Sequence, residues 1–333
     1  MSEADAPVKR PNGGDRLSVG LFLQRYAILV VWVAVIITFS ILRPETFFTL
    51  ANFQTIFGTQ TVLLIVTLGL LVPLAAGEFD LSTGAVLGFA STMTAYLNVV
   101  KGWPVLVAIG VVIVGALTIG AINALLVVRV GVPSIVATLG TGTLLTGIGL
   151  GISGSIIIGG VSDSLVEVTT TRVFGLPLAF YFGVLLCVAV WYVFMYTPLG
   201  RYMRFVAEGP EVARLSGLRV DGIRGGALVA SAVISALAGI TLVGSQGAAD
   251  PSSGADFLLP AFAGAFLGAA AIRPGEFNPW GSFVAVYFLV TGITGLQLLG
   301  LAGWVEQVFY GASLLIAVTL SQIAANRLAA TST

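Results

Sequence analysis

The sequence predicts an all-α membrane protein, a polytopic transmembrane helical bundle of about ten spans. Of its 333 residues, 57% are apolar and 9% are charged, whereas an ordinary soluble domain has about 25% charged residues. The mean hydropathy is +1.03. The apolar residues gather in repeated runs that are long enough to cross a hydrocarbon layer of about 30 Å. A water-soluble enzyme is therefore excluded.

Ten apolar segments in chain order account for the predicted helices, and the eighth is short enough to be a broken half-helix. No small-residue cleavage site follows the first segment, so we expect an uncleaved first helix. Residues 1–25 and 325–333 are expected to be cytoplasmic tails of a permease domain, 26–324. The ten predicted spans are 26–42, 56–76, 82–100, 103–128, 135–153, 178–196, 225–245, 257–272, 280–300 and 304–323.

Basic residues set the expected topology, because Lys and Arg accumulate in cytoplasmic loops. With both termini in the cytoplasm, only Arg43, Lys101 and Arg172 fall outside. The cytoplasmic set comprises Lys9, Arg10, Arg16, Arg25, Arg129, Arg201, Arg204, Arg214, Arg219, Arg224, Arg273 and Arg327. This asymmetry favours an even number of spans in a multi-pass protein.

Several chemistries are excluded by composition. The chain has no histidine, and its one cysteine, Cys187, lies in an apolar run, so we expect no metal site and no catalytic residue. A P-loop requires Gly-Lys followed by Ser or Thr, but both lysines, Lys9 and Lys101, follow a valine. We therefore expect no cofactor bound by this chain. Its net charge of zero also gives no sign of nucleic-acid binding.

Two similar tetrapeptides interrupt apolar segments in the two halves of the chain. Gly77-Glu78-Phe79-Asp80 and Gly275-Glu276-Phe277-Asn278 both fall toward the predicted cytoplasmic side. Broken helices within parallel pseudo-repeats are a known transporter arrangement. A chance match is the alternative, because the chain has 42 glycines.

The carboxylates of the first interruption mark a candidate solute pathway. Ionisable groups at membrane depth cost at least ~2.5 kcal/mol, so they usually face a cavity or a partner. Asp80 or Ser82 could instead merely cap the next helix. Polar residues inside helices can likewise serve only helix packing. The candidate pathway residues are Glu78, Asp80, Ser82, Thr83, Asn123, Thr138, Glu276 and Asn278.

The polar stretch 197–224 carries five arginines and three acidic residues. Residues 210–215 are expected to form a short helix, with Glu211 in its first turn and Gly217 as its C-terminal stop. A short helix across the cytoplasmic face could dock on another protein. The alternative is an ordinary basic cytoplasmic loop. On the predicted outer side, polar residues could meet a solute-delivery protein or form a solvated loop; these are Gln246, Asp250, Ser252, Ser253 and Asp256.

Three segments resemble the permease subunits of bacterial ABC importers of the ribose/xylose monosaccharide family. Residues 200–217, with Gly200-Arg201-Tyr202, Glu211 and Ala213-Arg214-Leu215-Ser216-Gly217, resemble the coupling loop that docks on the ATPase. Residues 77–84 resemble the family's GGIDLSVG, matching at Gly77, Asp80, Leu81, Ser82 and Gly84. Residues 133–141 look like its PxxIVTLGT segment.

The resemblance implies a permease in the bacterial inner membrane that forms the path for a monosaccharide, polyol or related small polar solute. It implies four partners: a separate ABC ATPase that binds ATP, an extracytoplasmic solute-binding protein, a second permease copy as homodimer or close paralogue, and the lipid bilayer. The ATPase-coupling residues would be Arg201, Glu208, Glu211, Arg214, Leu215, Ser216 and Gly217.

The sequence departs from the family pattern at three places. The family's second glycine is Glu78, its isoleucine is Phe79, and a glycine-rich segment is replaced by residues 268–276. These changes keep other solutes open, including a signalling sugar derivative or a basic solute. An ion-coupled secondary transporter is the alternative function. A membrane enzyme is a third, although no nucleophile and base pair is visible.

Overall fold

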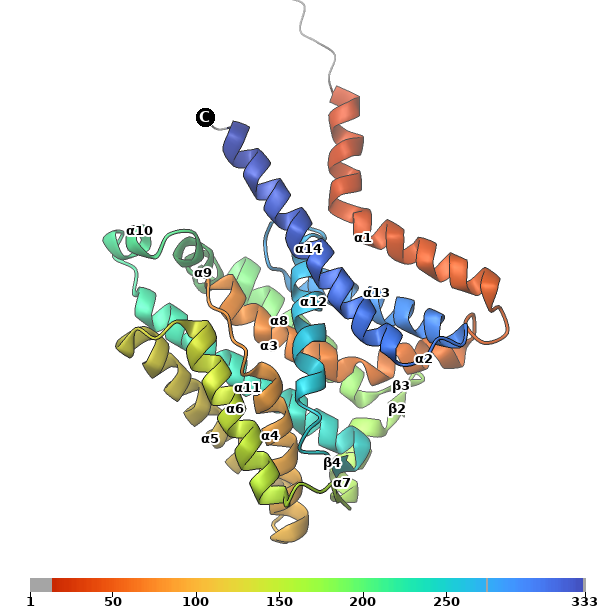
Figure 1. The fold of residues 1–333 in the computed structure, drawn as a ribbon, viewed down its shortest axis with the longest axis vertical. Helices are drawn as coiled ribbons and strands as arrows, with labels where there is room; N and C mark the ends of the chain where they lie inside the picture. Colours follow the sequence, from red (N-terminus) through yellow and green to blue (C-terminus); the bar gives the residue numbers. More distant parts are fainter. Residues whose placement is uncertain (1–13, 274, 332–333) are drawn as a thin grey trace, which may run out of the picture.

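The computed structural model describes residues 14–273 and 275–331, and the side chains of residues 26–319 apart from residue 274. This part of the chain is a helical bundle (Figure 1). The helices of the first half are α1 (Gly14–Leu42), α2 (Leu50–Thr59), α3 (Thr61–Ala75), α4 (Thr83–Ala95), α5 (Val105–Ala124), α6 (Ser134–Ser153) and α7 (Asp163–Thr170). Two π-helical turns, η1 (Tyr96–Val100) and η2 (Leu125–Val130), extend α4 and α5.

The second half contains two short helices between two long ones. Its helices are α8 (Leu178–Tyr196), α9 (Pro198–Glu208), α10 (Pro210–Leu215), α11 (Val220–Gln246), α12 (Ala255–Ala269), α13 (Pro279–Leu298) and α14 (Trp304–Thr331). The strands form two antiparallel pairs. These are β1 (Ile158–Gly159) with β4 (Ala248–Ala249), and β2 (Arg172–Val173) with β3 (Leu176–Pro177).

Each of the ten predicted spans corresponds to a helix, which confirms the polytopic helical bundle. Seven helices of the described residues, counting α2 and α3 together as Leu50–Ala75, are long and apolar enough to cross a membrane. Three further apolar segments are shorter within the residues whose side chains are described: Tyr26–Leu42 of α1, Ala255–Ala269 and Trp304–Thr319 of α14. The short eighth segment is thus the 15-residue helix α12.

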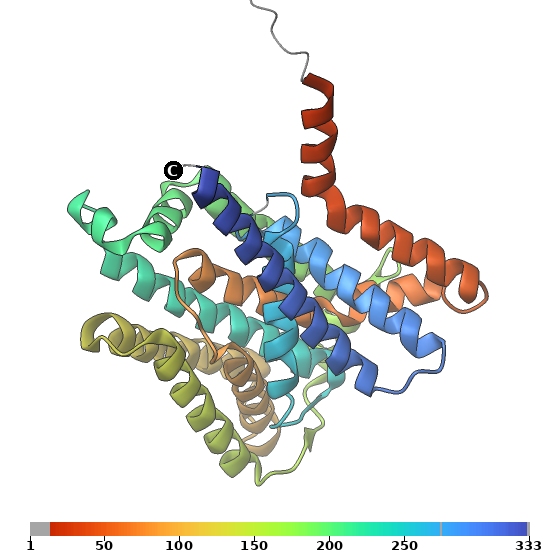
Figure 2. The same ribbon diagram turned by 45° about the horizontal axis from the view of Figure 1, so that its top comes forward.

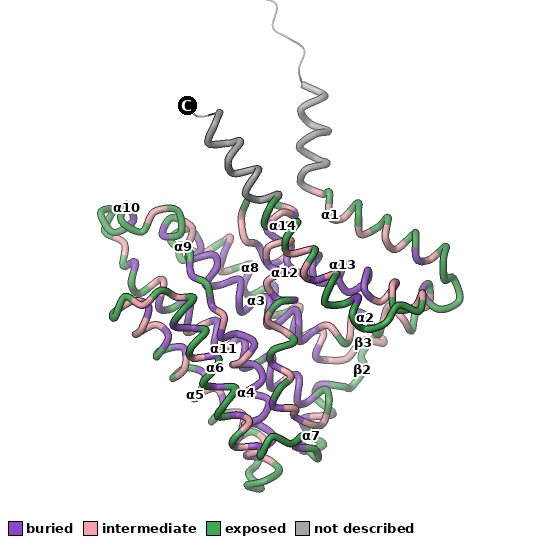
Figure 3. Tube along the Cα trace, viewed as in Figure 1, coloured by how far each residue is buried: buried purple, intermediate pink, exposed green. Residues whose placement is uncertain are grey.

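The core of the bundle is α3, in which every residue is buried. A helix that is apolar on all sides is stable only when other helices surround it. Of the apolar window in Leu50–Ala75, 72% is buried, but only 22% of that in Val105–Val130 is. Figure 3 shows the buried positions gathered along α3, α4 and α11. The exposed apolar side chains of α5 are suited to contact with lipid.

The polar stretch 197–224 is more helical than the sequence analysis predicts. The short helix at 210–215 is confirmed, but the residues before it form α9 rather than a loop. Pro198 starts α9, and the buried residues Gly200, Met203 and Val206 lie along one face. The arginines on the other faces of α9 make the segment look polar by composition, so the apolar face is not apparent from the sequence. In addition, α11 begins at Val220, five residues before the predicted start at 225.

The two ends of α11 carry different neighbours. α10 precedes its first turn and packs with α9, while α7 and β4 lie at its last turns (Figures 1 and 2). A helix of 27 residues rises about 40 Å. The α9–α10 end and the α7 end are therefore separated by about the thickness of a bilayer.

Candidate functional site: two helix breaks and the α9–α10 segment

The first predicted interruption is a true break between two helices. α3 ends at Ala75 and α4 begins at Thr83. Gly77 has a φ of +83°, and a Cβ added there would lie 3.2 Å from the Cα of Ala207 in α9. Only glycine adopts this conformation at low cost while allowing so close an approach. The chain therefore turns against α9 at this point.

Asp80 lies at the centre of a buried polar network. Its side chain is fully buried. Oδ1 accepts hydrogen bonds from the Ser82 backbone N–H at 2.9 Å and the Ser82 hydroxyl at 2.5 Å, and Oδ2 accepts one from the Ser231 hydroxyl at 2.7 Å. The Asn123 side-chain amide donates to Ser82 Oγ at 3.1 Å. One carboxylate thus joins the break to α11 and, through Ser82, to α5.

Hydroxyl groups in the first turns of α6 accept hydrogen bonds from backbone N–H groups of the same break. The Leu81 N–H donates to Thr138 Oγ1 at 3.0 Å, and the Phe79 N–H donates to Ser134 Oγ at 3.3 Å. Thr83 Oγ1 contacts the Asp80 carbonyl oxygen at 3.4 Å. Buried backbone groups must find partners where no helix supplies them. The structure therefore brings Asp80, Ser82, Thr83, Asn123 and Thr138 together around one break.

Glu78 forms an ion pair with Arg224, in the first turns of α11. The glutamate side chain is 5% exposed and the arginine side chain is 28% exposed. A carboxylate at this depth requires such a partner, because an unpaired buried charge is costly. The sequence alone predicts only a cytoplasmic location for Arg224.

The second predicted interruption, between α12 and α13, repeats this pattern with different details. Gly275 has a φ of +89°. Glu276 pairs with Arg204 of α9 at 2.9 Å and with Arg273 at 3.7 Å. The Asn278 carbonyl oxygen Oδ1 accepts the Gly281 N–H at 2.6 Å and so caps α13.

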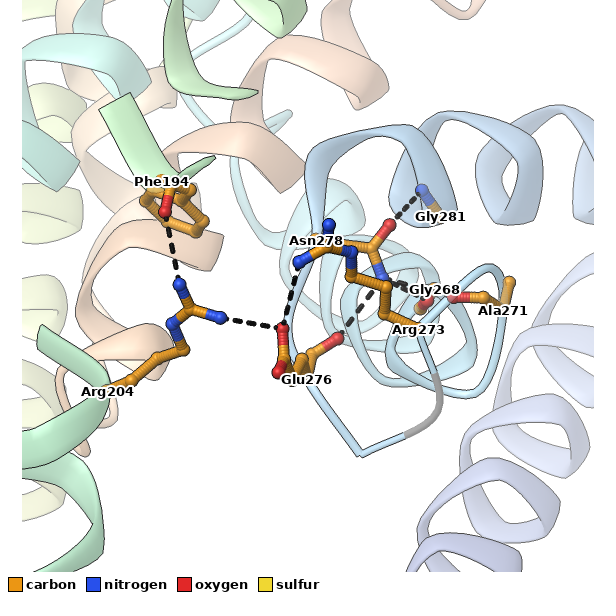
Figure 4. A network of polar contacts seen from close by, with 8 residues as sticks. All are labelled: Phe194, Arg204, Gly268, Ala271, Arg273, Glu276, Asn278 and Gly281. Carbon is orange, nitrogen blue, oxygen red and sulfur yellow. Dashed lines mark hydrogen bonds and ion pairs between the residues drawn. The ribbon is translucent and has the colours of Figure 1, made fainter. Parts of the chain in front are cut away.

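Asn278 also ties the second break to the end of α12, as Figure 4 shows. Its side-chain Nδ2 donates to the carbonyl oxygens of Gly268, Ala271 and Glu276 at 3.1–3.2 Å. A carboxylate could not replace it here, since three carbonyl acceptors require a donor. Asn278 is therefore the structural counterpart of Asp80: both accept a backbone N–H at the start of the following helix, and Asn278 also donates to carbonyl oxygens.

Aromatic rings connect the two breaks. Phe79 stacks on Phe262 and Phe266 of α12, with ring centroids 6.5 Å apart in each case. Phe277 meets Phe266 edge to face at 5.4 Å. Phe266 of α12 therefore packs against a phenylalanine from each break.

The predicted coupling residues lie on the exposed α9–α10 segment. Arg214 of α10 forms exposed ion pairs with Glu211 in the same helix at 3.2 Å and with Asp221 of α11 at 3.1 Å. Leu215 is 89% exposed. Gly217 has a φ of +83°, which confirms the predicted glycine stop. Arg201, Glu208, Glu211 and Ser216 are also exposed.

A cavity of about 210 Å³ lies between α9 and the second break. Arg204, Glu208 and Glu276 border it, together with residues at the ends of α3 and α8. The first break has Ala207 packed directly on Gly77. The α9 helix therefore sits tightly on one break and loosely on the other.

Two features escaped the sequence analysis. Arg204 and Arg224 bind the two glutamates, but pairs separated by 72 and 146 positions leave no local pattern. Ser231 lies in an apolar span, where a single serine is unremarkable without the fold. Among the described residues, no group of three or more His, Cys, Asp or Glu side chains could hold a metal ion.

The fold and these breaks define a class, a polytopic helical membrane transport protein. The family model described as "Branched-chain amino acid transport system / permease component" matches residues 52–318, and the chain belongs to this family. No solved structure matches the chain.

Three relatives give the family a narrower context. The chain is 28% identical to the D-allose transport system permease protein of Escherichia coli (strain K12) over 322 residues, 96% of this chain and 97% of the relative. It is 26% identical to the ribose import permease protein of Haemophilus influenzae over 311 residues, 92% and 96% of the two chains. It is 32% identical to the autoinducer 2 import system permease protein of Photorhabdus luminescens over 261 residues, 76% and 78%.

These comparisons confirm the predicted resemblance to ABC importer permeases of the ribose/xylose type. The chain is a transport subunit rather than an enzyme, and it is a multi-pass protein of the inner membrane. They favour the importer permease over the secondary transporter.

Proposed function

We propose that this permease carries a monosaccharide, polyol or closely related small polar solute into the cell. The names of the relatives support this solute class, since they transport or import D-allose, ribose and autoinducer 2. The energy comes from ATP bound by a separate ATPase subunit, because neither lysine of this chain has P-loop spacing. An extracytoplasmic binding protein delivers the solute, and a second permease copy, identical or paralogous, completes the pore.

The α9–α10 segment is the ATPase docking surface, and the end of the molecule that carries it is cytoplasmic, as are both termini. One observation carries this proposal: the segment 197–224 holds two arginines that each pair with the glutamate of one helix break. Movement of a docked ATPase would therefore reach both breaks. The exposed side chains of Val212 and Leu215 offer an apolar contact beside Glu211.

The buried polar residues of the two breaks change partners when the pathway opens. In this conformation Asp80, Ser82, Thr83, Asn123 and Thr138 are fully buried. Alternating access requires an ATP-driven preference for one of two states. The breaks are suited to carry it, because their polar groups can line a solute path once the helices separate.

The test is affinity purification of the tagged permease from native membranes, with ATPase activity measured on the eluate. We expect Leu215→Glu to lose at least tenfold of the co-purifying ATPase, since a charge replaces an exposed apolar contact. Leu215 is a better probe than Arg214, whose replacement would also disturb two ion pairs within the segment.

Phe174→Glu is the matched control, because Phe174 is 95% exposed in the turn between β2 and β3, away from α10. It should retain the ATPase at the wild-type level. Normal recovery and normal transport with Leu215→Glu would contradict the docking role. Gradient-driven uptake by membranes free of ATPase would contradict the ATP-driven mechanism as a whole.

A further inference from the structure

A second cavity, of about 340 Å³, lies at the end of α11 that is opposite α10. Its walls come from the start of α3, the last turn of α11 and the first turns of α12 and α14. Gln246, the last residue of α11, borders it. Since α11 rises about 40 Å from α10 to this point, the proposed cytoplasmic location of α10 places the cavity at the outer face.

Four polar side chains on this cavity have no partner within the described part of the chain. Gln246, Asp256, Glu306 and Tyr310 border the cavity, and none of their side chains makes a hydrogen bond or an ion pair there. Tyr310 is only 4% exposed. The side chains of Gln246, Asp256 and Glu306 are exposed. The cavity wall therefore carries donors and acceptors that remain available for a ligand.

The composition of the wall selects among solutes. Two carboxylates and the Gln246 amide can bind hydroxyl groups, and the ring of Phe257 with Pro260 offers an apolar surface. No lysine or arginine borders the cavity, so the carboxylates of Asp256 and Glu306 would repel an anionic solute without a compensating positive charge. Its volume lies at the lower end of the range for ligand pockets, about 300–1,000 Å³. These features fit a small, neutral, polyhydroxylated molecule.

We propose that this cavity is the outer solute-binding site of the permease, where a neutral monosaccharide or polyol is held by Gln246, Glu306 and Tyr310 before it passes between the helices. This proposal rests on the proposed importer function, and it assigns a solute-binding site to the outer end of that importer's pathway. Gln246 and Asp256, expected from the sequence to meet a delivery protein or solvent, border this site.

The first experiment measures solute binding to the full-length permease in lipid nanodiscs without any ATPase, by saturation-transfer NMR. The probes are D-allose and D-ribose as neutral sugars and putrescine as a cation. We expect a signal for at least one sugar and none for putrescine. Tyr310→Phe and Glu306→Gln should each weaken sugar binding at least fivefold, because the first removes a hydroxyl contact and the second replaces a charged acceptor with a weaker neutral one.

Tyr192→Phe and Glu167→Gln are matched controls, since both residues are exposed and neither borders the cavity. They should bind the sugar as the wild type does. Unchanged sugar binding by both cavity variants would overturn the proposal. The proposal would also be overturned if putrescine bound and neither sugar did. It would likewise be overturned if none of the three probes bound, even at about 50-fold the concentration used in sugar uptake assays.

The second experiment tests where the cavity opens. Ser245→Cys places a thiol on the wall, and its hydroxyl is already committed to the Thr241 carbonyl oxygen, so the free polar groups stay in place. In intact cells a membrane-impermeant thiol reagent should label it, and sugar should slow the labelling at least threefold. Thr170→Cys on α7 is exposed and should be labelled without protection.

The native Cys187 is buried and should not react. Labelling of Ser245→Cys that sugar does not slow would overturn the binding site. These outcomes are independent of the docking test, because no ATPase is needed here. Loss of ATPase recovery with intact sugar protection would support docking and the cavity separately. Normal ATPase recovery with intact sugar protection would remove the docking surface alone, and lost ATPase recovery without sugar protection would remove the cavity alone.

Discussion

The two helix breaks carry nearly the same four residues but differ in how deeply these residues are buried and how closely they pack. At the first break, Glu78 and its ion pair are largely buried, and Gly77 packs against Ala207 of α9. At the second break, Glu276 is 40% exposed and borders a cavity. The same sequence pattern therefore produces a tight anchor in one half and a looser contact in the other, and α9 touches both.

This difference indicates how force from a docked ATPase would be divided. A rigid contact transmits displacement, whereas a contact beside a cavity can yield. We infer that α9 moves with the first break and shifts relative to the second. Substitutions in the two breaks therefore test this asymmetry.

The largest effect is expected from the buried carboxylate of the first break. Asp80→Ala removes an acceptor of three hydrogen bonds and leaves the hydroxyls of Ser82 and Ser231 without it in a dry interior. We expect a loss of about 3–5 kcal/mol of stability, the range for breaking a buried charged network. The measurement is the apparent melting temperature in detergent, with the yield of folded protein.

Ser245→Ala serves as the control for Asp80→Ala, because Ser245 is exposed and its hydroxyl bonds only to the preceding turn of its own helix. Its melting temperature should stay within the error of the wild type. A wild-type melting temperature for Asp80→Ala would show that the network does not anchor the first break.

A smaller effect is expected from neutralising the two glutamates. Glu78→Gln leaves Arg224 with a neutral partner at a nearly buried site, and we expect a loss of about 2 kcal/mol. Glu276→Gln acts on an ion pair whose side chains are 34% and 40% exposed, so we expect less than about 1 kcal/mol. Thermal unfolding of both variants in the same detergent measures the difference in stability between them.

Charge reversal distinguishes the ion pair from local effects of each glutamate. Glu78→Arg combined with Arg224→Glu should recover part of the stability that Glu78→Arg alone loses. The corresponding exchange of Glu276 and Arg204 should recover less, because Arg273 also contacts Glu276. Equal losses for Glu78→Gln and Glu276→Gln would refute the asymmetry of the two breaks.

The helices and the breaks were predictable from sequence because local patterns encode them. Apolar runs mark the spans, and Gly77 and Gly275 mark the turns. The α10 helix was also predictable, since Gly217 ends it. By contrast, α9 was missed because its arginines conceal an apolar face of Gly200, Met203 and Val206.

The partners within the candidate site could not be predicted in the same way. Glu78 pairs with a residue 146 positions away, and Glu276 with one 72 positions away. Asp80 binds Ser231, which lies 151 positions later. Such pairs depend on how the helices pack, and no local spacing specifies them. The sequence identified the carboxylates as important, but only the fold shows which charge each one meets.

The smallest difference between the two breaks, about 1 kcal/mol, is expected at the two glycines, where it separates backbone conformation from packing. Both have positive φ, so alanine at either position strains the backbone by about 1 kcal/mol. At Gly77 the new Cβ would also lie 3.2 Å from the Ala207 Cα, whereas at Gly275 nothing lies within 4 Å. We therefore expect Gly275→Ala to cost about 1 kcal/mol and Gly77→Ala about 2 kcal/mol in thermal unfolding, since the second requires α9 to move away. Gly217→Ala, with a φ of +83° and open space around it, is the control and should resemble Gly275→Ala. Equal costs at all three positions would show that α9 does not rest on the first break, and the proposed rigid contact would be lost with it.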